Sequence, residues 1–165
     1  MDQQPVLIFI HIPKTAGATF SLILAHLYPQ RVHSIYSFAR IDDFQYIPEA
    51  ERAKIDLLQG HFAYGIHQCL PRPAQYITFL RNPVERILSF YYYILRQPDN
   101  YLYEAVVHNN VSLAEFVNSS LSTELYNLQV RMIGGTKDWR KQSFPEKQEA
   151  DLALAKKRLK EDFAA

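Results

Sequence analysis

The chain has 165 residues, which is enough for one sizeable core, and a single domain over residues 1–165 is expected. Its 18 Lys and Arg nearly balance 17 Asp and Glu, so composition gives no support for a nucleic-acid partner, and the single Cys69 excludes an internal disulfide. No apolar run approaches the ~18 residues of a membrane span, and MDQQP lacks the blocks of a signal peptide, so a cytoplasmic protein is expected.

The first predicted element is the apolar run Val6–Ile10, whose lack of alternation is typical of a strand buried on both faces of a parallel sheet. Small and polar residues follow, with Lys14 as the one long cation, and an apolar helical stripe starts at Phe20. A helix start directs unpaired N–H groups and a positive dipole end into such a turn. The pattern therefore predicts a phosphate or sulfate site. The alternative is an ordinary turn with a solvated lysine.

The middle of the chain predicts shorter elements. Residues 32–38 alternate loosely, which predicts a short strand. A helix is predicted from Pro48 through AERAKIDLL to residue 58, and QGHF then breaks its pattern. Residues 66–70 predict a single helical turn between that break and two prolines.

Residues 75–80 predict a second buried strand, followed by a helix to about Arg96. Asn82 is a good N-cap, Pro83 suits the first helical position, and Glu85 can reach back as in a capping box.

Arg81 ends this second strand, and Ser89 lies about two turns into the helix that follows. A guanidinium and a hydroxyl placed in this way can jointly hold a phosphate. The alternative is that Arg81 pairs with Glu85 and that Ser89 only packs.

The last third of the chain predicts a series of helices and loops. They are a loose segment over 99–110, a helix to 117 opened by the capping box of Ser112 and Glu115, a helix over 123–133 closed by Gly134 and Gly135, a loop over 138–145, and an amphipathic helix over 146–163 with Lys156, Lys157 and Arg158 on a solvated face.

Strands and helices that alternate in this way predict a three-layer α/β domain, with a mainly parallel sheet flanked by helices. In such sheets, ligands gather beyond the carboxyl ends of the strands. Lys14 and Arg81 belong to that edge, and His61 joins them if LLQGH is the end of a strand.

Three segments, HIPKTAGATF, GHF and TFLRNPVERILSFYYY, together resemble the sulfotransferases that use 3′-phosphoadenosine 5′-phosphosulfate (PAPS). The likeness is to the branch that contains heparan and uronyl 2-O-sulfotransferases and their bacterial relatives, and it runs from about Val6 to Phe163. It implies a P-loop-like α/β fold and transfer of a sulfuryl group from PAPS to an acceptor hydroxyl, with a carbohydrate as one candidate acceptor.

The resemblance also implies roles for single residues. His61 in GHF matches the family's general base, which takes the proton of the acceptor hydroxyl as a neutral imidazole. Lys14 is expected to stabilise the charge on the leaving oxygen. No metal is expected, because the His, Asp and Glu residues form no recognisable ligand cluster. The implied donor-binding residues are Lys14, Thr15, Ala16, Gly17, Ala18 and Thr19 for the 5′-phosphosulfate, and Arg81 and Ser89 for the 3′-phosphate.

Other polar and aromatic residues receive weaker expectations. His11 lies beside the loop and is expected to contact the donor or the base, whereas His67 is expected to be structural. The tyrosines 91–93 are expected to pack in the core. The polar residues Asn127, Gln129 and Arg131 either line the acceptor site or form a solvent-facing helix edge.

The chain departs from the family pattern in two places. Ala18 stands where a Thr or Ser is expected, and the chain ends at Ala165, where the family continues with another strand and helix. A non-catalytic nucleotide- or anion-binding domain is therefore an alternative function. A small P-loop kinase is disfavoured, because GxxxxGK[ST] and a magnesium-holding carboxylate after a strand are absent from the sequence.

Overall fold

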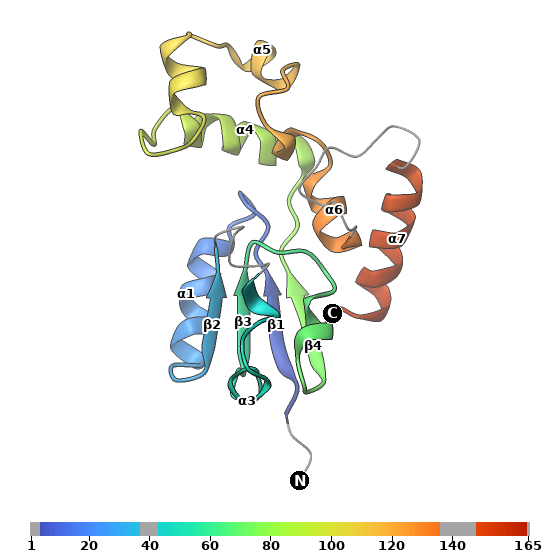
Figure 1. Cartoon of the computed structure of the whole chain (residues 1–165). Coiled ribbons are helices and arrows are strands. Elements are labelled where there is room, and N and C mark those ends of the chain that lie inside the picture. The colour runs from blue at the N-terminus through green and yellow to red at the C-terminus, as the bar shows by residue number, and fades with distance from the viewer. Residues whose placement is uncertain (1–3, 37–42, 136–147, 165) are drawn as a thin grey trace.

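The computed structural model describes residues 4–36, 43–135 and 148–164. Within them, a four-stranded sheet runs in the order β2-β3-β1-β4, and each neighbouring pair is parallel (Figure 1). The strands are β1 (Val6–Ile10), β2 (Val32–Ile35), β3 (Leu57–Gly60) and β4 (Ala74–Thr78).

Helices connect and cover these strands. The α-helices are α1 (Gly17–Leu27), α3 (Glu49–Arg52), α4 (Pro83–Ile94), α5 (Leu113–Val117), α6 (Leu128–Gly134) and α7 (Gln148–Glu161). Three further turns are the 3₁₀ helices η1 (Ile66–Cys69) and η3 (Thr123–Leu125) and the π-helix η2 (Glu104–His108).

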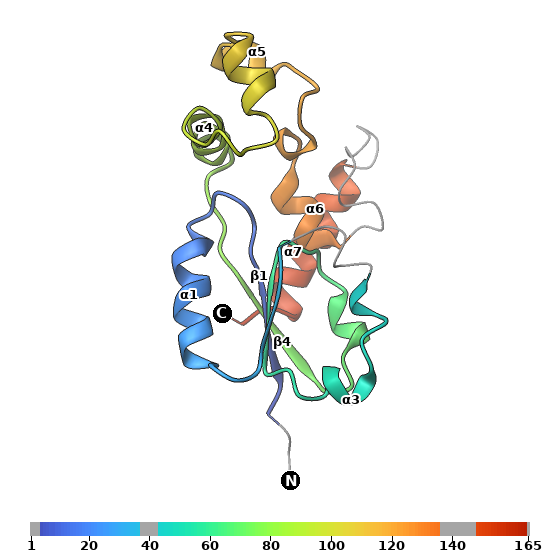
Figure 2. The same ribbon diagram turned by 60° about the vertical axis from the view of Figure 1, so that its left-hand side comes forward.

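Alternate side chains of β1 point to opposite faces of the sheet, and each face is covered by its own layer of helices. Val6, Ile8 and Ile10 face the larger core cluster, which includes residues of α6 and α7. Phe9 on the opposite face packs with Leu24 of α1. Figure 2 shows α1 on one side of the sheet and α6 and α7 on the other. The fold is therefore a three-layer α/β fold with a parallel sheet, as predicted.

A second apolar cluster belongs to residues 83–126, which comprise α4, η2, α5 and η3 and are called the helical lobe below. Figure 1 shows this lobe beyond the carboxyl ends of the strands. Its core consists of Phe90, Tyr91, Ile94, Leu102, Val106, Phe116 and Leu125.

The strand register aligns the carboxyl ends of the sheet. Ile10 pairs with both Gly60 and Thr78, and Ile35 also pairs with Gly60. Gly60 has a φ of 148°, and a Cβ atom there would overlap the Ile35 carbonyl oxygen, so only glycine fits. The segments that follow the four strands therefore leave the sheet at one edge.

The helix predicted from Pro48 to residue 58 is wrong in its second half. α3 ends at Arg52, and Leu57 and Leu58 are fully buried in β3 between β1 and β2. The sequence AERAKIDLL suits a helix locally, but pairing with two strands outweighs that local propensity.

The helix predicted over 123–133 is broken into η3 and α6. Asn127 adopts a left-handed conformation with a φ of 48°, which asparagine tolerates better than most residues. The buried Arg131 donates hydrogen bonds to the carbonyl oxygens of Tyr126 and Thr123, and the Thr123 carbonyl also accepts from the Tyr126 N–H of η3. The arginine therefore stabilises the break.

Other differences are smaller. Residues 99–110 contain η2, and α1 begins three residues before Phe20. Arg158 of α7 lies over the Tyr64 ring and donates to the Gly134 carbonyl, so it is not on a solvated face. The predicted loop over 138–145 and residues 37–38 and 146–147 of two predicted elements lie outside the described residues. The Asn82 cap and the capping box of Ser112 and Glu115 are confirmed.

In the described parts of the chain, no helix combines the length and the apolar character that a membrane span requires.

Candidate functional site

A cavity of about 400 Å³ lies at the carboxyl edge of the sheet, between the segments after β1, β3 and β4 and the helix α4. It brings together most of the residues that the sequence singled out. The lining residues are His11, Pro13, Lys14, Ala16, Gly17, Ala18, His61, Arg81, Ser89 and Tyr93.

The start of α1 supplies backbone donors to this cavity. Ala16 precedes the helix in a left-handed conformation, and no side chain caps the first turn. The N–H groups of the first turn therefore have no helical partner, and they form the positive end of the helix dipole. Two expected residues do not line the cavity: the Thr15 hydroxyl donates to the Ile12 carbonyl at 2.8 Å, and the Thr19 side chain is exposed.

Arg81 connects the β4 corner of the cavity to the β1 corner. Its Nη1 donates to the carbonyl oxygen of Lys14 at 3.4 Å, and its Nε lies 3.4 Å from a carboxylate oxygen of Glu85. The pairing with Glu85 that the sequence left as an alternative is therefore present. It is a partly exposed ion pair, and such pairs contribute about 0–1 kcal/mol, so Glu85 is weakly held. The Glu85 side chain is directed to Arg81, so the predicted capping box at α4 is not formed.

The backbone of Arg81 is held by Gln129 of α6. The Gln129 amide accepts from the Arg81 N–H at 3.0 Å and donates to the Arg81 carbonyl at 2.9 Å. Gln129 is expected from the sequence at the acceptor site or at a solvent-facing edge; the structure instead places its amide group on the segment between β4 and α4 that carries Arg81. The predicted strand over 75–80 ends at Thr78, so Arg81 follows the strand and does not end it.

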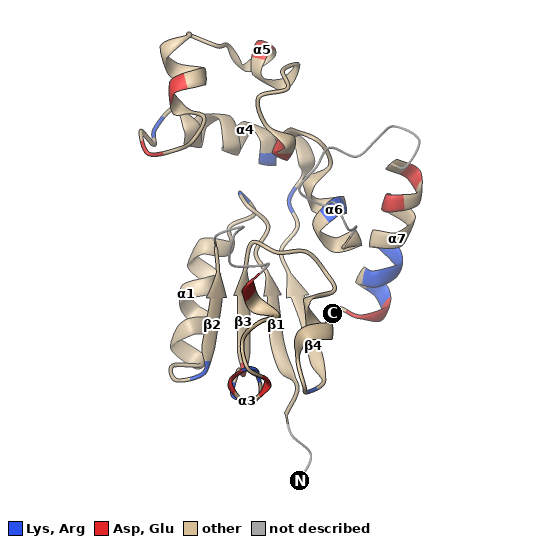
Figure 3. Ribbon diagram, in the orientation of Figure 1, with Lys and Arg blue, Asp and Glu red and all other residues tan. Residues whose placement is uncertain are grey.

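Positive charge gathers around Lys14. Its Nζ lies 3.7 Å from the centroid of the Tyr93 ring, a cation–π contact. Burial lowers the pKa of Lys14, and Arg96 and Arg81 lower it further, against a smaller opposing effect of Glu124. Figure 3 shows basic residues on the segments after β1 and before α4. These cations repel one another, and a bound anion would relieve that repulsion.

His61 has its tautomer fixed by the backbone. Its Nδ1 lies 2.6 Å from the His11 carbonyl oxygen, which can only accept a hydrogen bond. Nδ1 therefore carries the proton, and Nε2 keeps its lone pair. Burial lowers the pKa of His61 below its ordinary value of 6.5, so the ring is neutral at pH 7. A neutral imidazole with a free Nε2 is suited to accept a proton.

A family model described as "Sulfotransferase family" matches residues 1–159, which is nearly the whole chain. The chain belongs to the sulfotransferase family. Transfer of a sulfo group is therefore its general activity, with a hydroxyl-bearing acceptor as the family suggests. A search among curated proteins gives no match.

Two residues of this sulfotransferase site were missed in the sequence. Tyr93 lines the cavity, and the positive charge of Arg96 lowers the pKa of Lys14. Both lie on α4 or directly after it, four and seven positions from Ser89. That spacing places all three on one helical face, so helical periodicity counted from Ser89 could have found them.

Some polar residues of the sulfotransferase lie away from the cavity. His67 contacts the Tyr76 hydroxyl at 2.8 Å through Nδ1, in agreement with its expected structural role. Tyr91 is buried as expected, but Tyr92 and Tyr93 are not. In the described residues, no three His, Cys, Asp or Glu side chains group as a metal site would need.

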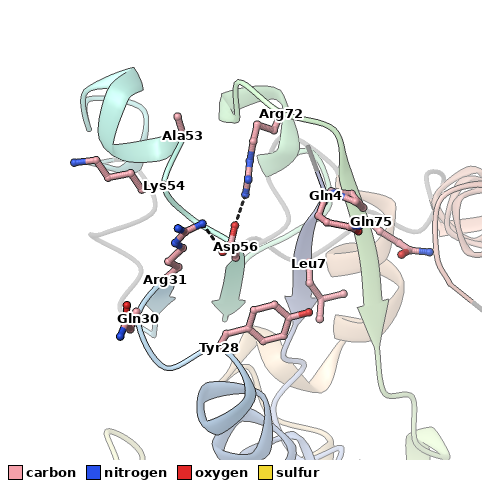
Figure 4. Close-up of a pocket in the computed structure, with 11 residues that line it drawn as sticks. Gln4, Leu7, Tyr28, Gln30, Arg31, Ala53, Lys54, Asp56, Arg72 and Gln75 are labelled. Atoms are coloured by element: carbon pink, nitrogen blue, oxygen red, sulfur yellow. Dashed lines mark hydrogen bonds and ion pairs between the residues drawn. The ribbon is translucent and has the colours of Figure 1, made fainter. Parts of the chain in front are cut away.

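A larger cavity, of about 890 Å³, lies at the opposite edge of the sheet (Figure 4). Its central charged groups are paired with one another: Asp56 accepts from Arg72 at 2.7 Å and from Arg31 at 3.2 Å. These pairs join the segments that precede β2, β3 and β4. The cluster therefore connects the segments at the starts of the strands. Ligands of parallel sheets bind beyond the carboxyl ends of the strands, so the larger volume of this cavity does not make it the better candidate site.

Proposed function

We propose that this sulfotransferase transfers a sulfuryl group from PAPS to an acceptor hydroxyl, with His61 as the general base. The observation that carries the proposal is the hydrogen bond from Arg81 to the Lys14 carbonyl. This contact joins the segment after β1 to the segment after β4 at one cavity that His61 also lines, which supports a ligand that carries anionic groups at two positions.

The residues at the cavity fit the charge distribution of PAPS, which carries a phosphosulfate at the 5′ position and a phosphate at the 3′ position. The uncapped N–H groups of Gly17, Ala18 and Thr19 and the ammonium group of Lys14 suit the 5′ group. Arg81 and Ser89 suit the 3′-phosphate, which distinguishes PAPS from ATP. Thr15 and Ala16 contribute through the shape of the loop.

When bound, PAPS supplies the sulfuryl group, and negative charge develops on the oxygen that leaves with the 5′-phosphate. The Lys14 ammonium group and the backbone N–H groups of the loop stabilise that charge. The Nε2 atom of His61 takes the proton of the acceptor hydroxyl, and the Nδ1–H bond to the His11 carbonyl keeps the ring in place. Positioning and charge stabilisation then supply most of the acceleration, as in phosphoryl transfer.

For the acceptor, we propose a carbohydrate hydroxyl, and we propose that transfer needs no metal. The motif likeness to the 2-O-sulfotransferase branch supports the first statement. The cations Lys14 and Arg81 at the cavity support the second, because they can hold the donor's charge themselves. A panel of uronate-containing and neutral oligosaccharides tests the acceptor. Treatment of the enzyme with EDTA should leave the transfer rate unchanged.

Calorimetric titrations with adenosine 3′,5′-bisphosphate, ADP and AMP test the donor. We expect tight binding only when the 3′-phosphate is present, and Arg81→Gln should remove most of this preference. A preference for ADP with magnesium would contradict the proposal and favour a kinase. Selective binding of the bisphosphate without transfer to any acceptor would favour the non-catalytic binding domain.

His61→Ala tests the general base. Transfer should fall by about 10²–10⁴-fold, the usual contribution of general base catalysis, while affinity for adenosine 3′,5′-bisphosphate stays nearly unchanged. The matched control is His26→Ala, because His26 is an exposed histidine in the last turn of α1. An equal loss of affinity and of transfer in His61→Ala would show that His61 binds the donor instead.

A further inference from the structure

Next to His61, the cavity contains a second imidazole. The ring of His11 lies 4.8 Å from that of His61, centroid to centroid, and His11 also lines the cavity. Burial, and then the charge of His61, lower the pKa of His11 to about 4. Both rings are therefore neutral at pH 7, and what each can do depends on which of its nitrogens carries the hydrogen.

A chain of hydroxyl groups reaches the Nδ1 atom of His11. The Tyr36 hydroxyl donates to Ser21 Oγ at 2.8 Å, and Ser21 Oγ lies 3.5 Å from His11 Nδ1. Because Ser21 accepts from Tyr36, its own hydrogen is available to His11. When Tyr36 donates to Ser21 and Ser21 donates to His11, both hydroxyl hydrogens have an acceptor. The Nδ1 atom of His11 is then the acceptor, so His11 carries its hydrogen on Nε2.

The Cδ2–Nε2 edge of the His11 ring faces the start of α1. A Cβ atom added to Gly17 would overlap His11 Cδ2 and lie 2.6 Å from Nε2, so the absence of a side chain at Gly17 makes room for this edge of the ring. The rest of the ring is held by Phe9, which stacks on it at 5.6 Å with an interplanar angle of 12°. Tyr36 meets His11 and His61 edge-on, at 5.7 and 5.0 Å.

We propose that the two histidines act as opposite tautomers: His61 accepts the acceptor's proton at Nε2, and His11 donates from Nε2–H to an anionic oxygen of the sulfuryl donor. Ser21 and Tyr36 are positioning residues that hold His11 in this tautomer. This assignment rests on the proposed function for the identity of the anionic oxygen. The tautomers themselves follow from the contacts of His11 and His61.

Long-range ¹H–¹⁵N NMR of the ligand-free protein at pH 7 tests the tautomers without any turnover. His11→Gln and His61→Gln assign the signals. We expect the hydrogen on Nδ1 in His61 and on Nε2 in His11. Ser21→Ala removes the hydroxyl group, so His11 should populate both tautomers. Ser21→Thr keeps a hydroxyl group and should restore the Nε2–H tautomer. Ser34→Ala is the matched control, because the Ser34 hydroxyl accepts from Gln59. A hydrogen on Nδ1 of His11, or a charged His11, would overturn the proposal.

Kinetics test the donor role. His11→Leu should lower kcat by about 10–100-fold, and His11→Gln, which keeps an N–H donor, should recover part of the loss. Tyr36→Phe keeps the ring and should lower kcat by a few-fold with little change in donor KM. An unchanged kcat in His11→Leu would overturn the donor role. If PAPS supports no transfer in the wild type, the proposed function fails, whereas the NMR result still decides the tautomers.

Discussion

Lys14 and Ala16 both have a positive φ, 70° and 68°, although neither is a glycine. This conformation costs a non-glycine residue about 1–2 kcal/mol, so the surrounding contacts must maintain it. The Thr15 hydroxyl holds the turn through Ile12, and the Arg81 guanidinium holds it through the Lys14 carbonyl. The loop is thus shaped before any ligand arrives, and a preshaped site loses little free energy to ordering when it binds.

Ala18 gives the first prediction at this scale. It lines the cavity at the position where the family pattern has a hydroxyl, so Ala18→Ser adds one donor toward the bound anion. One such hydrogen bond should tighten the binding of adenosine 3′,5′-bisphosphate by about 3–10-fold in a calorimetric titration. Thr19→Ala is the control and should change affinity little, because that side chain does not line the cavity. Equal effects of both changes would contradict the assignment of Ala18.

The lowered pKa of His61 sets the pH dependence of transfer. Burial disfavours the protonated ring, so the neutral, base-competent form persists below pH 6.5, the ordinary pKa of histidine. Because the pKa of His61 lies below 6.5, we expect kcat/KM to fall to half of its plateau value at a pH below 6.5. A pH–rate profile from pH 4.5 to 8 checks this. A midpoint above pH 6.5 would show that His61 is not the base.

At the scale of elements, β3 depends on the charged cluster at its start. Asp56 directly precedes β3 and holds Arg72, whose side chain is 10% exposed. The hydrogen bond from Arg72 is the main reason why the pKa of Asp56 lies below its ordinary value. The lowered pKa means that Asp56 contributes stability above its unfolded-state pKa of about 3.9, and that this is lost as the pH falls through the lower folded-state value.

Asp56→Asn should therefore lower the free energy of unfolding at pH 7 by about 1–3 kcal/mol, because Arg72 stays buried and loses a charged acceptor. Urea unfolding measures this. The difference between the variant and the wild type should shrink as the pH falls below about 3.9. Arg31→Gln is the control and should cost less than about 1 kcal/mol, since Arg31 is mostly exposed. A difference that does not depend on pH would contradict the role of the Asp56 charge.

At the scale of the molecule, the cavity lies between the sheet and the helical lobe, which have separate apolar cores. Lys14 belongs to the loop after β1, whereas Ser89 and Tyr93 belong to α4. A ligand that binds both corners adds contacts across this boundary. It should therefore restrain the lobe relative to the sheet.

Adenosine 3′,5′-bisphosphate at about 100 times its Kd should stabilise the fold by about 2.7 kcal/mol, which raises Tm by roughly 5–10 °C. Hydrogen exchange should slow in α4 as well as at the start of α1. AMP at the same concentration is the control, and it should protect α1 more than α4 because it lacks the 3′-phosphate. Protection of α1 alone by the bisphosphate would show that Arg81 and Ser89 do not hold the ligand.

Local patterns were enough to predict much of the fold and part of the site. The apolar run Val6–Ile10 predicts a buried strand. Asn82 and Ser112 are N-cap residue types that stand directly before helical patterns. The loop at Lys14 combines small residues with a helix start. The three-layer α/β fold follows from such elements in alternation, because parallel strands need crossover connections, which are usually helical.

Only the tertiary structure decided the features that depend on partners far along the chain. Residues 57–60 became a strand because β1 and β2 pair with them, against the helical pattern before them. Gln129 holds Arg81 across 48 positions, and Tyr93 meets Lys14 across a still longer separation in sequence. The tautomer of His61 depends on the His11 carbonyl, 50 positions away. A single sequence contains no local signal for such contacts, because their energy arises only when the sheet has brought the strand ends together.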